Sequence, residues 1–409
     1  MQKLENLKIL VSGQALVGRL ETLEDYLRDR VDTLGVIGID NISSPKRLAR
    51  LSLYKNKAKV KTLPLPSIRL RRKTPFNNLL LIASFLMQFL TIFFSIMFLG
   101  KQFDIFIGVG CFPTFVGVVL KKIKRIKHCI YYCIDYFPVQ KKISFNYFLL
   151  KVLLYADLLC VKYSDLTWHI SPLIPQARKK YTGFDKSKYN YIDVPLCFNE
   201  RLLNIKPLDK IERNTLAFVG TSGYFHGLNL LFEALPYVIR EAPEIKIKII
   251  GVGPWDEFQK KIKDAGIEKH FIIRGYIEDD LALTEELSYS AAGLALYIPV
   301  EENPSVYADP GKPKLYAFCG LPLIITKTPY VAKEISDRKA GIVIDYTKED
   351  LAGAIIEILK NDDKYQLYRK NAFSFANDYT HKKIYDCAFA ETLPFIYNLR
   401  TKRKVSING

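Results

Sequence analysis

Short apolar runs alternate with helix-period segments along most of this chain. In the first half, the runs that we expect to form strands are 7–12, 31–39, 103–109, 129–134 and 157–161. In the second half we expect strand 215–219, helix 228–240, strand 245–250, helix 255–265, strand 270–273, helix 280–290 and strand 293–297. Such alternation predicts βα units around a mostly parallel sheet. The expected fold class is therefore α/β, with doubly wound sheets.

A polar segment, residues 206–214, interrupts this alternation. The chain has 409 residues, which is too long for one compact core, so two domains of roughly 200 residues each are expected. We place the linker in the polar segment, between an N-terminal domain over 1–206 and a C-terminal domain over 213–375. Residues 376–409 are predicted to form a helix followed by a basic tail.

The longest apolar run, residues 79–99, contains no charged side chain. As a helix it would span roughly 31 Å, enough to cross a bilayer. It lies, however, between the strands expected at 7–12 and 103–109, which should pair in one sheet. We therefore expect a helix that lies in the bilayer interface or is buried within the domain. Its polar residues recur every three or four positions and predict a wetter face: Ser84, Gln88, Thr91 and Ser95.

Positive charge is concentrated in the first half of the chain. Residues 1–206 carry 33 Lys and Arg against 14 Asp and Glu, whereas the rest carries 27 against 28. One basic cluster immediately precedes the apolar run: Lys55, Lys57, Lys59, Lys61, Arg69, Arg71, Arg72 and Lys73. A basic flank beside an apolar helix is typical of peripheral membrane proteins. We expect residues 55–101 to meet an anionic membrane surface. Nucleic acid is not an expected partner, since no zinc knuckle, RNP-like or helix-turn-helix motif is found.

Seven cysteines occur, without a CxxC pair, and no cleavable leader is recognised at the N-terminus. Free thiols in a reducing cytoplasm are the simplest interpretation. The five histidines are scattered, so we expect no metal site.

The segment 309–322 is the strongest candidate for chemistry. Asp309 and Pro310 resemble a helix start, with a capping oxygen followed by a proline at the first helical position. Lys312 and Lys314 then place two cations in the first turn, where the helix dipole disfavours them. Added to the free N–H groups of that turn, they make a candidate diphosphate site. Two solvated lysines on a surface turn remain an alternative.

Three glycine-rich turns precede this segment. They follow the expected strands and cover residues 220–227, 251–254 and 274–277. One such turn is a weak signal, because ordinary βα turns often contain glycine. Four motifs in this order, over about a hundred residues, are a strong one.

Together these motifs resemble the nucleotide-sugar half of a GT-B glycosyltransferase, closest to the retaining family four. The N-terminal half looks compatible, with a strand, a glycine loop from Gly13 to Gly18, and the segment 129–138. The resemblance implies two Rossmann-like domains facing across a cleft. It also implies that the C-terminal domain holds the nucleotide diphosphate, that the N-terminal domain holds the acceptor, and that a final helix at about 379–398 returns to the first domain. No cofactor beyond the donor and no metal are implied.

Two departures from the family pattern affect the expected site. Thr221 and His226 stand where the family usually has an arginine and a lysine, and Tyr307 and Leu315 stand where it has two glutamates. The residues expected at the donor diphosphate are Gly13, Gly220, Thr221, Gly311, Lys312 and Lys314. Those expected at the sugar, ribose or base are Tyr276, Ile277, Glu301, Glu302 and Asp309. The catalytic candidates are Asp135 and His226.

The expected function is transfer of a sugar from a nucleotide-diphosphate sugar to a hydroxyl of a lipid-linked or glycan acceptor. The expected location is the cytoplasm, at the inner face of the cell membrane. The departures leave open a specialised subgroup or a domain that has lost activity. A nucleotide-sugar epimerase and a non-catalytic partner-binding protein are the alternatives.

Overall fold

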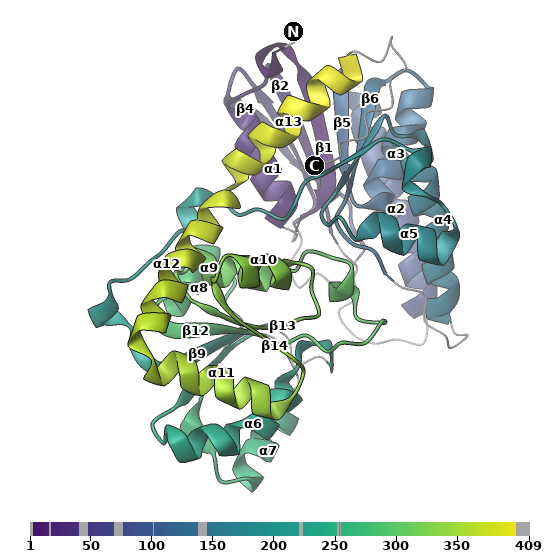
Figure 1. The fold of residues 1–409 in the computed structure, drawn as a ribbon. Helices are drawn as coiled ribbons and strands as arrows, with labels where there is room; N and C mark the ends of the chain where they lie inside the picture. The colour runs from purple at the N-terminus through teal and green to yellow at the C-terminus, as the bar shows by residue number, and fades with distance from the viewer. Residues whose placement is uncertain are drawn as a thin grey trace. The chain divides into compact units, whose positions relative to one another are not determined.

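The computed structural model describes residues 3–15, 18–40, 48–68, 77–100, 102–137, 145–220, 224–251, 253 and 255–397. The chain divides into two compact units. Figure 1 shows both, with the colour running from purple at the N-terminus to yellow at the C-terminus. Unit 1 comprises Met1–Pro195 together with His381–Gly409, and unit 2 comprises Leu196–Thr380. Each unit contains its own sheet. Each unit is a doubly wound α/β unit, as the sequence predicts.

The described residues of unit 1 form an eight-stranded sheet in the order β4-β3-β2-β1-β5-β6-β7-β8. Its strands are β1 (Lys8–Gln14), β2 (Thr33–Ile39), β3 (Arg50–Lys55), β4 (Ala58–Pro64), β5 (Phe103–Val109), β6 (Ile126–Cys133), β7 (Leu166–His169) and β8 (Tyr191–Asp193). From β2 to β8 the neighbouring strands are parallel. The central strands β1, β2 and β5 are mostly buried apolar runs, as expected for a sheet covered on both faces. The β3–β4 pair is an antiparallel hairpin that extends one edge.

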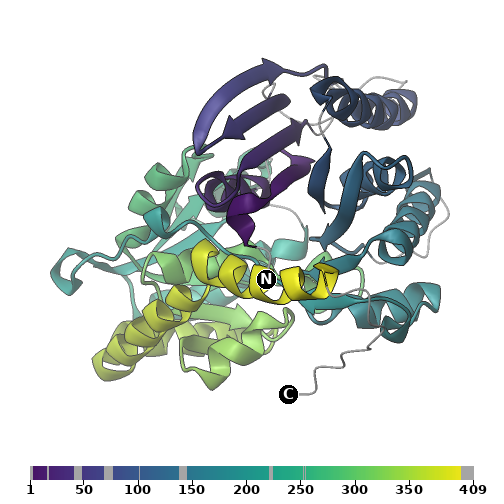
Figure 2. The ribbon, with the colours of Figure 1, turned by 90° about the horizontal axis from the view of Figure 1, so that it is seen from above.

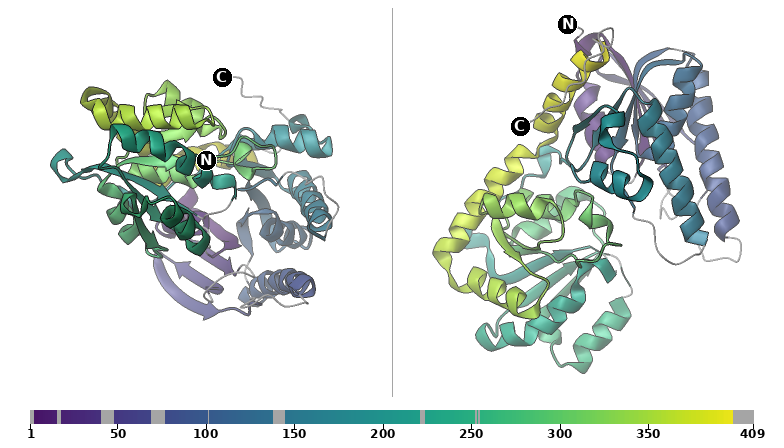
Figure 3. Two further views of the ribbon diagram at one scale, coloured as in Figure 1. Left: turned by 90° about the horizontal axis from the view of Figure 1, so that it is seen from below. Right: turned by 45° about the vertical axis from the view of Figure 1, so that its right-hand side comes forward.

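Helices cover both faces of this sheet. They are α1 (Gly18–Arg28), α2 (Asn77–Leu99), α3 (Cys111–Lys122), α4 (Phe145–Tyr163), α5 (Ile174–Thr182) and α13 (His381–Tyr397). Helices α2, α3 and α4 lie side by side on one face (Figure 3). Helix α13, the helix expected at about 379–398, packs beside α1, where Tyr26 stacks on Phe389.

Unit 2 has a six-stranded parallel sheet among its described residues, in the order β11-β10-β9-β12-β13-β14. Its strands are β9 (Glu212–Val219), β10 (Lys246–Ile250), β11 (Phe271–Gly275), β12 (Ser290–Ala295), β13 (Leu323–Thr326) and β14 (Gly341–Ile344). Its helices are α6 (Leu228–Glu241), α7 (Trp255–Asp264), α8 (Asp280–Ser288), α9 (Gly311–Phe318), α10 (Val331–Asp337), α11 (Lys348–Lys360) and α12 (Asp362–Asp378). One apolar core packs α6 and α11 on the sheet, and another packs α9, α10 and α12 on its other face.

Several elements of the structure differ from the prediction. Residues 157–161, expected to be a strand, belong to helix α4, because an uninterrupted apolar run is compatible with either element. The β3–β4 hairpin was not predicted, since the exposed strand β4 contains Lys59 and Lys61 and has no apolar run. Unit 2 begins at Leu196, ahead of the linker expected at 206–214, because Leu202 packs in the unit 2 core.

Helix α2 has its polar side chains on the buried face, opposite to the expected wetter face. Ser84, Thr91 and Ser95 are between 2% and 8% exposed. The Gln88 side-chain amide donates to the backbone oxygen of Asp40 at 3.1 Å and to Ser84 Oγ at 3.3 Å. Small hydroxyl side chains let the helix approach the body of the unit. Ile92 and Ile96 complete this inner face within an apolar core that also contains residues of β2, β3, β5 and α3.

The outer face of α2 is apolar. Five large side chains spaced four residues apart are 38% to 87% exposed: Ile82, Leu86, Leu90, Phe94 and Phe98. The segment Leu80–Leu99 is the one helix of the described residues that is long and apolar enough to cross a membrane. Because β4 and β5, on either side of α2 in the chain, belong to one sheet, α2 is an element of unit 1 and not a separate span. Figure 2 shows α2 beside the β3–β4 hairpin at one edge of unit 1.

Candidate active site

The candidate site lies at the carboxyl edge of the unit 2 sheet. The chain moves outward from β9 in one direction through β10 and β11, and in the other through β12, β13 and β14. The strand order therefore reverses between β9 and β12, and doubly wound folds bind ligands outside the carboxyl ends of strands at such a point. Gly220 directly follows β9 at this position.

Three glycines leave this edge of the sheet without side chains. Gly220, Gly251 and Gly275 follow or end β9, β10 and β11, and each has a positive φ of 141°, 152° and 70°, respectively. Their backbones are joined laterally, since Gly220 N–H donates to Ile250 O and Gly251 N–H donates to Gly275 O. A Cβ at position 251 would overlap the carbonyl of Gly220. The glycine-rich turns thus serve close backbone packing across three strands.

Lys312 extends from the start of α9 across Gly220. A Cβ at position 220 would lie 2.7 Å from Lys312 Cε. The ammonium donates to Nδ1 of His226 at 3.1 Å and stands 4.9 Å from the centroid of the Phe218 ring. Within the described residues, no carboxylate oxygen lies within 4 Å of this ammonium. Lys312 is therefore a half-buried cation without a counter-ion at the end of β9.

Burial changes the protonation of this pair. It lowers the pKa of Lys312 to about 7, because removal from water disfavours the charged amine. Burial, followed by the charge of Lys312, lowers the pKa of His226 to about 4. At neutral pH the imidazole is therefore uncharged, and its Nδ1 is free to accept the lysine hydrogen. An anion bound beside Lys312 would favour the charged amine and raise the pKa of Lys312.

The N-terminus of α9 adds donors next to Lys312. The helix begins at Gly311, and the N-cap residue Pro310 has no side chain that could accept the first N–H groups. The N–H groups of Gly311 and Lys312 have no acceptor within the helix, and they carry the positive end of its dipole. Asp309 was expected to cap this helix, but its carboxylate has other partners.

Asp309 and Lys314 form a buried ion pair inside unit 2. Lys314 is 1% exposed, and its ammonium contacts the Asp309 carboxylate and donates to Leu196 O at 2.9 Å. The same carboxylate accepts the N–H of Leu196 at 2.8 Å, and the ring of Tyr379 lies 3.7 Å from the ammonium. Burial lowers the pKa of Lys314, and Asp309 opposes that shift. The pair anchors the first residues of unit 2 to α9, which argues against the predicted ligand roles of both side chains.

Tyr316, one turn along α9, fixes the end of β9. Its hydroxyl accepts the N–H of Val219 at 2.7 Å and donates to Leu294 O at 3.1 Å. The tyrosine ring occupies the space that a side chain at position 293 would need, so Gly293 lets α9 approach the sheet. This contact connects the helix that carries Lys312 to the strand that carries Gly220. Sequence reasoning missed this contact, and its only local signal is a glycine, Gly293, within a strand.

The comparisons with known proteins concern the part of the chain that carries this site. Residues 213–361 match the family model described as Glycosyl transferases group 1. The matched residues lie entirely within unit 2 and make up less than half of the chain. All of Gly220, His226 and Lys312 lie within the matched residues.

Two curated relatives and one solved structure illustrate the similarity. A poly(glycerol-phosphate) alpha-glucosyltransferase of Bacillus subtilis is 26% identical over 163 residues, which are 39% of this chain and 23% of that protein. A GDP-mannose-dependent alpha-(1-6)-phosphatidylinositol monomannoside mannosyltransferase of Mycolicibacterium smegmatis is 26% identical over 130 residues, 30% of this chain and 32% of that protein. The chain thus matches a third or less of the length of these relatives.

The solved structure extends the likeness to both units. Anabaena Alr3699/HepE, solved in complex with UDP and glucose, aligns with a TM-score of 0.63 at 14% identity. The alignment covers 95% of this chain and 99% of that one. At this identity the likeness concerns the fold, which is GT-B.

The remaining predicted residues of unit 2 are placed as follows. Tyr276 is 61% exposed and follows β11. Ile277 is partly buried and packs against the apolar core that contains residues of α9. Glu301 and Glu302 are exposed in the turn after β12. Thr221 lies outside the described residues. The roles of these residues at the sugar, ribose or base remain predictions.

Two predicted residues belong to unit 1. Gly13 lies within β1 and faces Val109 of β5, whose Cβ would be 2.8 Å from a Cβ at position 13. Asp135 is exposed and follows β6. Both positions are near the carboxyl ends of central strands. The expected roles of Gly13 at the diphosphate and of Asp135 at the acceptor are not tested by the unit 2 geometry.

Proposed function

We propose that this chain is a glycosyltransferase that moves a sugar from a nucleotide-diphosphate sugar to a hydroxyl acceptor. One observation carries the proposal: Lys312 presents an ammonium without a carboxylate partner beside Gly220 and the N-terminus of α9. A diphosphate supplies the missing negative charge. The group 1 domain and the named activities of the two curated relatives support this assignment.

In our proposal, Lys312 supplies the positive charge that the family pattern places in the first glycine-rich turn, where this chain has Thr221 and His226. Sugar transfer leaves a negatively charged nucleoside diphosphate, and fixed positive charge at that point lowers the barrier. In our proposal the protonated Lys312 and the N–H groups of Gly311 and Lys312 meet the diphosphate. His226 keeps the amine directed over Gly220. Retention of configuration and independence of metal are parts of the proposal that rest on the family resemblance.

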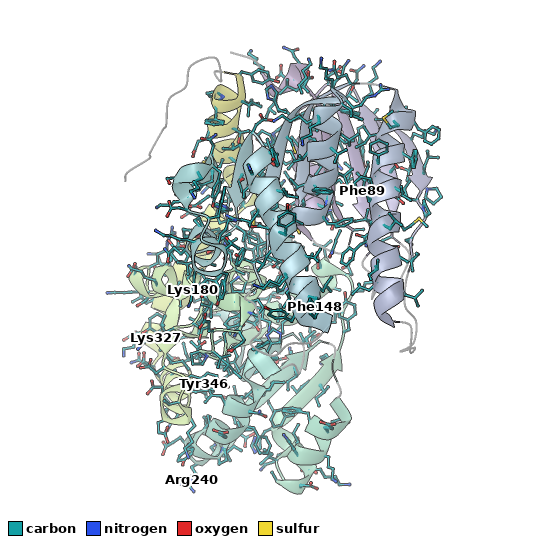
Figure 4. The ribbon with its side chains drawn as sticks, turned by 90° about the vertical axis from the view of Figure 1, so that its right-hand side faces the viewer. Phe89, Phe148, Lys180, Arg240, Lys327 and Tyr346 are labelled. Carbon is teal, nitrogen blue, oxygen red and sulfur yellow. The ribbon has the colours of Figure 1, made fainter. Side chains whose placement is uncertain are left out.

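The proposed acceptor is a lipid-linked glycan or polymer at a membrane surface. The outward apolar stripe of α2 supports this, because large side chains such as Phe98, 87% exposed, are unfavourable in water. Helix α4 adds Phe148, which is 61% exposed and is labelled in Figure 4. The neighbouring lysines of β4 suit an anionic surface, such as the cytoplasmic leaflet of a cell membrane. We accordingly propose a peripheral cytoplasmic location.

Thermal unfolding with nucleotide sugars tests the donor assignment. The purified full chain is heated with a panel that begins with UDP-glucose and GDP-mannose, and release of the nucleoside diphosphate is followed in parallel. A specific donor raises the free energy of unfolding by RT ln(1 + [L]/Kd). The Lys312→Met variant should lose most of that gain. The control Lys360→Met alters an exposed lysine that pairs with Glu241 at the ends of α11 and α6.

Three outcomes are decisive. A donor-specific shift with turnover, reduced in Lys312→Met and kept in Lys360→Met, supports the proposal. A shift without turnover favours a non-catalytic domain, a possibility raised by Tyr307 and Leu315 at the family's carboxylate positions. Absence of any shift at millimolar concentration contradicts nucleotide binding.

A further inference from the structure

The β3–β4 hairpin and helix α2 enclose an open apolar cavity of about 500 Å³ within unit 1. One wall is the hairpin and the segment after it: Leu51, Leu53, Lys61, Leu63, Leu65 and Pro66. The other is a single stripe of α2 and its end: Met87, Leu90, Thr91, Phe94, Ser95, Phe98 and Leu99. Every lining residue lies in unit 1. The cavity is therefore distinct from the nucleotide site proposed in unit 2.

Regular strand pairing forms the sheet wall. Leu51 pairs with Leu63, and Leu53 pairs with Lys61, so these four side chains share one face of the hairpin. The register shifts by one residue at Val60, which is 61% exposed and does not line the cavity. The helix wall repeats every three or four residues, as one face of a helix requires. Two regular elements thus face one another without filling the space between them.

An unfilled apolar space of this size is unusual. Helices normally pack on sheets at the density of an organic crystal, with few voids larger than a water molecule. Water in an apolar groove is unfavourable relative to an apolar occupant. The polar residues of the lining are Lys61, Thr91 and Ser95, and the buried Oγ1 of Thr91 has no hydrogen-bond partner among the described residues. Such a lining suits an alkyl chain whose polar head lies beside a cation.

The groove is continuous with the exposed apolar face of α2. Leu90, Phe94 and Phe98 line the cavity and are also 38%, 49% and 87% exposed. A surface on which this face lies would therefore meet the opening of the groove. Charge indicates the kind of surface, since residues 41–103 contain twelve Lys and Arg and no Asp or Glu. A membrane surface of anionic lipids is complementary to this positive charge.

We propose that this groove holds one alkyl chain of an anionic membrane lipid, with Lys61 beside the lipid headgroup. The chain would lie between the leucines of the hairpin and the aromatic residues of α2. This inference rests on the membrane contact in the proposed function, and it adds a defined lipid-binding site to a surface contact. It does not depend on nucleotide binding or on sugar transfer.

A fluorescent fatty acid whose emission rises in apolar sites is the direct probe. It is titrated into the full chain and then displaced with unlabelled palmitate. The test variant is Leu63→Trp, which places a larger side chain in the open groove. Its matched control is Val60→Trp, on the same strand but outside the groove lining, where the native side chain is 61% exposed. Circular dichroism and nucleotide binding check that both variants fold.

Saturable binding by the wild type and by Val60→Trp, with at least tenfold weaker binding by Leu63→Trp, is the expected result. Lys61→Gln should weaken palmitate and leave a neutral long-chain alcohol unaffected. Equal affinity of Leu63→Trp and wild type for the fatty acid would overturn the proposal. The absence of saturable binding would also overturn it, and would favour a protein segment as the occupant of the groove.

Vesicles of phosphatidylglycerol and phosphatidylcholine separate this inference from the proposed membrane contact. A double variant of the outer face, Ile82→Asn with Leu86→Asn, lies outside the groove lining and should reduce vesicle binding while it retains fatty-acid binding. If wild-type vesicle binding is present but Leu63→Trp leaves fatty-acid binding unchanged, the groove inference alone is wrong. Loss of nucleotide turnover with intact fatty-acid binding would count only against the glycosyltransferase proposal.

Discussion

Lys312 is held in a state that lowers stability in the absence of a ligand. Its amine is partly buried beside His226 without a carboxylate partner among the described residues, and its pKa is lowered to about 7. Proteins often bury a charged group at a binding site, which lowers the stability of the unliganded protein but serves its function. We therefore expect Lys312→Met to raise the free energy of unfolding of the unliganded chain by about 0.5–2 kcal/mol at neutral pH. Urea denaturation measures this, and a decrease in the variant would show that the lysine stabilises the fold.

The pH dependence of stability follows from the same pair. A lysine of ordinary pKa 10.5 in the unfolded chain binds more protons than the folded Lys312 between pH 7 and 10.5. Stability due to this group therefore rises with pH across that window and is lowest below pH 7. His226, with a pKa lowered from 6.5 to about 4, acts in the same direction between those values. The stability advantage of Lys312→Met should shrink as pH rises from 7 toward 10; a constant advantage would contradict the lowered pKa.

Lys314 differs from Lys312 although only two residues separate them. Two residues along a helix turn a side chain by about 200°, so one lysine faces the glycines and the other faces the interior. Breaking a buried ion pair by removing one partner leaves an uncompensated charge. We expect Lys314→Met and Asp309→Asn each to lower the free energy of unfolding by about 3–5 kcal/mol. The affinity of the folded fraction for nucleotide should not change. A loss of nucleotide affinity in the folded protein would show that Lys314 contributes to the nucleotide site.

The sequence could place both lysines at a helix start but could not assign their roles. The pattern 309–314 contains no information on which side chain meets Leu196, because that residue lies more than a hundred positions away. Tyr316 was missed for the same reason, since its two backbone partners lie in β9 and β12. Gly220 was predicted, because a glycine directly after a buried strand is a local signal.

Helix α2 was predicted as an element, but its orientation was not. The polar residues were expected to face water, whereas the structure packs them inward and leaves Leu86 and Phe94 outside. Hydroxyl and amide groups can be satisfied inside by neighbouring backbone, as Gln88 is by Asp40. A row of polar residues on a helix is therefore not necessarily its solvent-exposed face in the folded unit.

Substitution on the outer face of α2 tests the proposed membrane contact at the scale of this element. Ile82→Asn with Leu86→Asn removes two exposed apolar side chains that have little to lose in the folded state, so stability should change by less than about 1 kcal/mol. Vesicle affinity should fall about tenfold or more, because each buried CH₂ contributes about 0.8 kcal/mol. Leu367→Asn on α12, 44% exposed, is the control. Equal sedimentation of all three proteins with anionic vesicles would contradict the contact.

At the scale of the whole chain, the α/β class and most elements of unit 2 could be predicted. Strands such as β10 and β13 are continuous apolar runs followed by glycine-marked or amphipathic segments, and those signals are local. The edge strand β14 was not predicted, and the true start of unit 2 at Leu196 also escaped prediction. Both depend on packing between distant segments, such as Leu202 against Phe318 in one core.

The most direct test of the central claim compares a nucleoside diphosphate with its nucleoside. The affinities of the full chain for UDP and uridine, or for GDP and guanosine if that base is preferred, are measured by calorimetry for wild type, Lys312→Met and Lys360→Met. The ratio of the two affinities isolates the contribution of the diphosphate. A charged hydrogen bond contributes about 1.5–3 kcal/mol, so the ratio should fall about 10- to 100-fold in Lys312→Met and stay unchanged in Lys360→Met. A ratio that is the same in all three proteins would show that Lys312 does not hold the diphosphate.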